Sequence, residues 1–162
     1  MIKTKTVETT LGGLVEDGYG IIEGLAESCR ESFDNLPENL QNTSRNQTLG
    51  QAADDLENVS NADVPDGLAD IKMSVEQSYE TTKKGASRSV QRDFAVTMLG
   101  HAKDRVDEEI AILEAEEDDD ESEEDDESPN REKIDQYEAF SEELQTMIDE
   151  AESVEFPGGM MG

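Results

Sequence analysis

A nearly unbroken run of acidic side chains near the C-terminus limits what this chain can bury. Between Glu116 and Glu127 every residue except Ser122 is aspartate or glutamate. So many like charges cannot leave water without counter-charges, and the surrounding sequence offers few. A compact core must therefore be built from the residues before and after this segment.

The remaining charge is also distributed unevenly. The chain of 162 residues has 42 acidic and 13 basic side chains, which give a formal net charge of −29. Up to Arg105 there are 18 acidic and 11 basic residues, whereas after it there are 24 and 2, so the two parts carry −7 and −22. Adaptation to high salt would spread acids over every exposed surface. The asymmetry instead favours a local role for the charge.

The apolar pattern predicts an all-α protein, a small bundle of four to five helices with an acidic low-complexity block before the last helix. Seven aromatic residues and no tryptophan leave aliphatic side chains, methionine and alanine to form the core. The expected segments are a flexible N-terminal arm at 1–13, a helical domain at 14–113, the acidic block at 114–128, a C-terminal amphipathic helix at 129–154 and a flexible tail at 155–162.

Two helices are expected in the first 60 residues or so. Apolar residues at three- and four-residue steps predict a helix from Leu14 to just before Pro37. Ser44 followed by Gln47 resembles a capping box that starts the second helix. Residues 2–7 alternate weakly and would suit a short strand, but no second strand is evident to pair with it. We therefore interpret the N-terminus as an arm.

Three more helical patterns follow. One is expected from Asp66 to Gly85, with Leu68, Ile71, Val75 and Tyr79 facing inward. The longest pattern begins after Ser87 and runs to Leu113 and into the acidic block. The last begins at Pro129, which suits a first helical turn. Its apolar face would contain Ile134, Tyr137, Phe140, Leu144, Met147, Ile148 and Ala151.

The residues needed for catalysis or metal binding are scarce. The chain has one cysteine, Cys29, expected in the core, and one histidine, His101, expected on a helix flank, so no zinc site can be assembled. A calcium loop starting at Asp118 would place Glu123 where glycine is required and Pro129 where glutamate is required. We expect no enzymatic activity and no cofactor. The net charge disfavours direct nucleic-acid binding, and no apolar run is long enough to span a membrane.

The charge itself is the candidate functional feature. The residues expected to bind a partner are Asp107, Glu108, Glu109, Glu114, Glu116, Glu117, Asp118, Asp119, Asp120, Glu121, Glu123, Glu124, Asp125, Asp126 and Glu127. As a continuous helix they would present one charge per ~2.1 Å, whereas duplex DNA presents one per ~1.7 Å. A solvated spacer between two helical parts is an equally good interpretation of the same residues.

The segment 22–71 contains a turn with an aspartate-asparagine-apolar-proline-glutamate pattern between two acidic amphipathic helices. The turn is formed by Asp34, Asn35, Leu36, Pro37 and Glu38 and is followed by Gln41. In these residues the segment resembles small uncharacterised proteins of tailed bacteriophages. The resemblance implies a viral origin and no assigned activity. This chain has Ser32 and Phe33 where those relatives have an aromatic pair, and they have no such acidic block.

The sequence therefore predicts a phage-encoded helical protein that binds and inhibits a basic host protein, acting as a nucleic-acid mimic against a defence or transcription factor. The expected location is the host cytoplasm, with association with the virion as the alternative. One alternative is a virion component that self-associates through apolar faces around Phe94 and Phe140. Another is an acidic adaptor or spacer without mimicry.

Overall fold

The computed structural model describes residues 2–59, 61–80, 87–119 and 129–156. Over these ranges the chain forms six helices and two strands. In chain order they are β1 (Ile2–Thr10), α1 (Leu11–Asp34), α2 (Glu38–Gln41), α3 (Ser44–Glu57), α4 (Asp66–Ala69), β2 (Lys72–Glu80), α5 (Arg88–Asp119) and α6 (Pro129–Glu152). The predicted all-α class is confirmed, and a small sheet accompanies the helical bundle.

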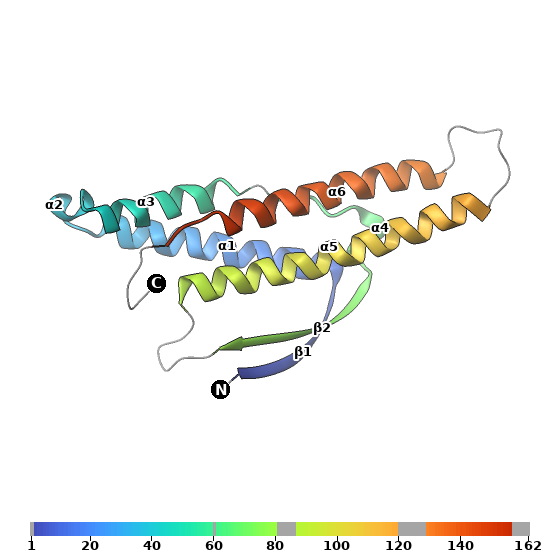
Figure 1. The fold of residues 1–162 in the computed structure, drawn as a ribbon, viewed down its shortest axis with the longest axis horizontal. Coiled ribbons are helices and arrows are strands. Elements are labelled where there is room, and N and C mark those ends of the chain that lie inside the picture. Colours follow the sequence, from blue (N-terminus) through green and yellow to red (C-terminus); the bar gives the residue numbers. More distant parts are fainter. Residues whose placement is uncertain (1, 60, 81–86, 120–128, 157–162) are drawn as a thin grey trace.

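Four long helices run along the long axis of the molecule, and the two strands lie to one side of them (Figure 1). α1 packs against both α3 and α5, and α5 packs against α6. The helices in each of these pairs run in opposite directions (Figure 1). α5 and α6 thus form an antiparallel hairpin. The first part of α5 and the last part of α6 pack against the rest of the bundle.

The core is aliphatic, as the lack of tryptophan predicts. Its largest fully buried side chains are Phe140, Leu11, Leu14, Ile22, Leu68, Leu99, Leu144, Met147, Val15, Val106 and Cys29. The whole apolar face predicted for the last helix, from Ile134 to Ala151, is buried. Val90 and Phe94 of α5, also expected to face inward, are only half-buried.

The N-terminal residues form a strand, so the expectation of a flexible arm at 1–13 was wrong. β1 pairs antiparallel with β2, from Ile2 opposite Glu80 to Thr10 opposite Lys72. Threonine and valine favour strands because their branched side chains fit a pleated surface. The helix that follows starts at Leu11, three residues before the predicted Leu14, because the Thr10 hydroxyl accepts a 3.1 Å hydrogen bond from the Gly13 amide.

The partner strand β2 lies where a third long helix was expected. Among the residues of that segment that the structure describes, 66–80, only Asp66–Ala69 is helical. Val75 is buried and Met73 half-buried, whereas Lys72 and Ser74 are exposed, which is the alternation of a half-buried strand. The spacing of four between Ile71 and Val75 misled the sequence interpretation, because it fits one face of a helix and one face of a strand equally well.

The start of α3 also differs from the prediction. The capping residue is Thr43, whose hydroxyl accepts a 3.3 Å hydrogen bond from the Asn46 amide. Ser44 is the first helical residue. The cap therefore lies one residue before the predicted capping box.

Candidate functional site

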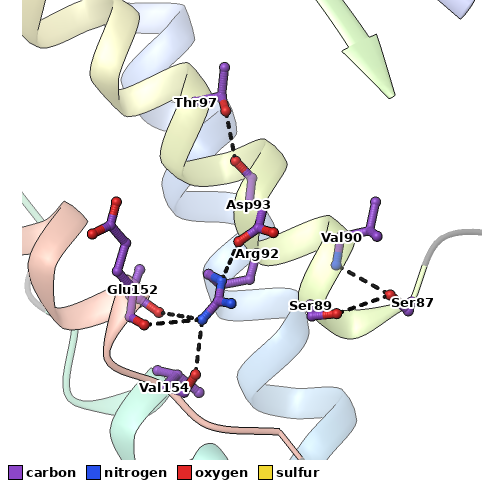
Figure 2. Close-up of polar contacts among 9 residues, drawn as sticks. Ser87, Ser89, Val90, Arg92, Asp93, Thr97, Glu152 and Val154 are labelled. Atoms are coloured by element: carbon purple, nitrogen blue, oxygen red, sulfur yellow. Dashed lines mark hydrogen bonds and ion pairs between the residues drawn. The ribbon is translucent and has the colours of Figure 1, made fainter. Parts of the chain in front are cut away.

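The base of the α5–α6 hairpin is fixed by Arg92. Its Nη1 donates hydrogen bonds to the carbonyl oxygens of Ala151, Glu152 and Val154, at 3.2, 3.3 and 2.9 Å. Figure 2 shows the guanidinium reaching from α5 to the end of α6, with Nε directed to Asp93. The carbonyls at a helix C-terminus lack helical partners and carry partial negative charge, so an arginine suits them. Arg92 also lies over the Phe156 ring, 5.6 Å from its centroid.

The middle of the hairpin is joined by Asp107 of α5 and Ser141 of α6. The Ser141 hydroxyl donates to Asp107 Oδ1 at 2.7 Å, and Lys103 Nζ donates to Oδ2 at 2.9 Å. Partial burial raises the pKa of Asp107, but the hydrogen bonds from Ser141 and Lys103 outweigh it and hold the pKa below its ordinary value. Asp107 was expected to bind a partner, and the structure instead places it in a contact between helices.

Two further predicted site residues pair with a cation on their own helix. Arg105 Nη1 lies 3.1 Å from a Glu109 carboxylate oxygen and 3.9 Å from one of Glu108. These pairs at i,i+4 and i,i+3 partly neutralise the acids at this level of α5. The contacts of Glu108 and Glu109 therefore lie within the protein, like that of Asp107.

Beyond the Arg105 pairs, α5 carries acids and no base, whereas residues 129–141 of α6 carry three acids with Arg131 and Lys133. We call residues 107–119 of α5 and 129–141 of α6 the distal hairpin, since the Asp107–Ser141 bond sets these segments side by side. Glu114 and Glu116 are exposed on α5, and the exposed acids Glu132, Asp135 and Glu138 face solvent from α6. The far end of the distal hairpin projects past the other elements of the bundle (Figure 1), whereas Tyr137 of the same hairpin lies against Gly67 of α4.

The remaining predicted residues divide into two groups. Glu117, Asp118 and Asp119 belong to α5, so the first six residues of the acidic block, 114–119, are helical. The other seven lie outside the described residues: Asp120, Glu121, Glu123, Glu124, Asp125, Asp126 and Glu127.

The linear charge density of the distal hairpin approaches that of duplex DNA. Its α5 segment has eight acids and no base, and its α6 segment has three acids with Arg131 and Lys133, for a formal net charge of −9. Lys103 and Arg105, which precede the segment on α5, offset part of the charge of Asp107, Glu108 and Glu109. Thirteen helical residues extend ~20 Å, which gives one net charge per ~2.2 Å against ~1.7 Å for duplex DNA. This linear charge density comes from two antiparallel helices, whereas the sequence interpretation assigned a similar density to a single continuous helix.

The sequence interpretation missed the contribution of α6 to this surface. The acids at 132, 135 and 138 recur at three-residue steps on the side of α6 opposite its apolar face, so the signal was present. It was overlooked because the acids of α6 are separated by neutral residues. Arg92 was missed because nothing in its local sequence indicates a contact 60 residues away.

The side chains most often used in catalysis lie apart from this surface. Cys29 is fully buried in α1, and that burial raises the pKa of its thiol although the charge of Arg88 opposes the rise. His101 is half-buried on α5. Within the described ranges no three His, Cys, Asp or Glu side chains are grouped so that they could hold a metal ion. The helices of the described chain are all too short or too polar to cross a membrane.

Fold and surface together define an acidic helical bundle with a projecting two-helix hairpin. Comparison with protein-family models, with curated proteins and with solved structures gives no match. The function must therefore be argued from the distal hairpin itself.

Proposed function

We propose that this protein is a phage-encoded acidic helical protein that binds a basic, nucleic-acid-binding host protein through the distal hairpin and blocks its nucleic-acid site. The observation that supports this most is the projecting hairpin with one net charge per ~2.2 Å. A basic groove that normally binds nucleic acid would release ions to this surface much as it does to phosphates. The viral origin depends on the resemblance of residues 22–71 to phage proteins.

The anchoring contacts support a rigid surface. Arg92 fixes the base of the hairpin, and the Asp107–Ser141 bond fixes the level at which the acidic part begins. A pre-organised surface loses less conformational entropy when it binds, so charge of the same density binds more tightly on a fixed hairpin than on a loose tail.

The alternative of self-association through apolar faces receives no such support. Phe140, one of the two residues expected at its centre, is only 2% exposed because α6 packs that face against its own bundle. Phe94 is half-buried. We therefore propose no second function.

Pull-down from a bacterial lysate tests the proposal. The protein should retain nucleic-acid-binding proteins, recovery should fall steeply as salt rises, and added duplex DNA should displace them. Deleting residues 114–128 should remove most of this recovery. Recovery that persists after the deletion, or that duplex DNA does not reduce, would contradict mimicry.

A further inference from the structure

The exposed face of α1 carries two glycines that the fold of this chain does not require. A Cβ atom added at Gly18 would lie 3.1 Å from the Leu99 side chain, so Gly18 allows α1 and α5 to approach. At Gly20 and Gly24 an added Cβ would meet nothing within 4 Å. Each glycine in a helix interior costs about 1 kcal/mol relative to alanine. Their presence on an open face is accounted for if a partner backbone approaches there.

Two surface hollows flank these glycines. One, of about 660 Å³, lies between α1 and α3 and is lined by both Gly20 and Gly24. The other, of about 480 Å³, lies between α1, α5 and the end of β1, and Gly20 lines it too. Gly20 therefore separates the two hollows on the surface of α1, and Gly24 borders the α1–α3 hollow alone.

The hollows differ in chemistry. The α1–α3 hollow is acidic, with Glu23, Glu27, Glu31 and Glu57, and its Arg30 is already paired with Asp54 and Glu57. The α1–α5 hollow has an apolar floor and an acidic rim: its floor includes Ile21, Phe94 and Met98, and its rim Glu16 and Asp17. Ile21 and Phe94 are only half-buried within the chain.

We infer that this surface receives an amphipathic basic helix of a partner protein, which crosses α1 at Gly20 and Gly24. Its lysine or arginine side chains would enter the acidic α1–α3 hollow, and its aliphatic side chains would cover Ile21 and Phe94. Helix axes pack 8–10 Å apart depending on the side chains between them, and bare glycines permit the close end of that range. A second copy of this chain is a poor occupant because each copy carries −29. The inference is separate from the role of the distal hairpin.

Leucine substitutions at the glycines provide the test. Gly20→Leu and Gly24→Leu would fill the crossing point, and both should raise Tm because leucine is the better helix former. Gly100→Leu on α5 is the matched control, since a Cβ there also meets nothing within 4 Å and Gly100 lines neither hollow. A loss of binding in the first two variants then cannot be attributed to unfolding.

The probe is a synthetic amphipathic peptide of about 20 residues, ~30 Å long as a helix, with leucines on one face and lysines beside them. A peptide of the same composition in shuffled order measures how much of the binding results from charge alone. The distal hairpin also attracts lysines, so titrations are run in the full-length protein and in a full-length variant with Glu114→Gln, Glu132→Gln, Asp135→Asn and Glu138→Gln.

We expect the ordered peptide to shift backbone amide resonances around Gly20 and Gly24 in both backgrounds. Gly20→Leu and Gly24→Leu should each raise Kd at least about tenfold, whereas Gly100→Leu should leave Kd unchanged. Shifts confined to α5 and α6, equal binding of the shuffled peptide, or an unchanged Kd in the glycine variants would overturn the inference. Because the same titrations are run in the variant with four distal-hairpin acids neutralised, binding at α1 is distinguished from binding at the hairpin, and the two proposals fail separately.

Discussion

Individual polar side chains hold the hairpin in place at widely spaced points. Arg92 contacts three carbonyl oxygens at the end of α6, and only 16% of its side chain is exposed. Hydrogen bonds from a charged donor in such a place are worth more than those at the surface. Glu108, by contrast, lies on the surface of α5 with 72% of its side chain exposed, where an ion pair contributes little.

Replacement of Arg92 should therefore destabilise the fold. We expect Arg92→Ala to lower the free energy of unfolding by about 2 kcal/mol, because three carbonyl oxygens lose their donor. The free energy of unfolding of Arg92→Lys should lie between those of the unsubstituted protein and Arg92→Ala, since one ammonium cannot reproduce the fork of the guanidinium. Urea denaturation measures this, with the exposed Arg45→Ala as control. A cost for Arg92→Ala no larger than for the control would show that Arg92 does not anchor α6.

The contact between Asp107 and Ser141 should depend on pH. The pKa of Asp107 is lowered in the folded state, so its stabilisation is complete above its unfolded pKa of about 3.9 and is lost as pH falls through the folded pKa. A double-mutant cycle with Asp107→Asn and Ser141→Ala should give a coupling of at most about 1 kcal/mol at pH 7, because 46% of the Asp107 side chain is exposed. The coupling should disappear at a pH low enough to protonate the Asp107 carboxyl in the folded state. A coupling that persists there would mean that the carboxylate charge plays no part.

The long amphipathic helices could be predicted from the sequence, whereas the two paired strands could not. The faces of α1, α3, α5 and α6 each repeat over several turns, so the 3.6-residue period stands out. β2 offered one ambiguous spacing, Ile71 to Val75, and its partner β1 lies more than 60 residues away in sequence. Pairing between such distant segments depends on tertiary contacts, which local patterns do not record.

Substitutions at the start of α3 test whether Thr43 or Ser44 is the N-cap of this helix. Thr43→Ala should cost about 1 kcal/mol, because the Asn46 amide loses its acceptor, whereas Ser44→Ala should be nearly neutral. Thermal unfolding of the two variants gives the comparison directly. If Ser44→Ala is the more destabilising change, the capping box expected from sequence is correct and the assignment of Thr43 is not.

Across the whole molecule, the position of the acidic residues matters as well as the total net charge. The bundle supplies a buried core and a fixed hairpin base. The distal hairpin carries 11 acids, and its far end projects beyond the bundle (Figure 1). Net charge alone would attract any basic protein, so a test of the distal hairpin has to separate the position of the charge from its amount. Two sets of substitutions that change the net charge equally can do so.

The most direct measurement is the affinity of a purified host partner, obtained by pull-down, for two variants that both shift the net charge from −29 to −25. The hairpin variant has Glu114→Gln, Glu132→Gln, Asp135→Asn and Glu138→Gln. The control variant has Asp34→Asn, Glu38→Gln, Asp63→Asn and Asp70→Asn, all exposed and outside the hairpin. If the distal hairpin is the binding surface, the hairpin variant should raise Kd at least about tenfold and the control variant should change it little. Equal losses in the two variants would contradict a localised surface and leave only a general attraction between opposite charges.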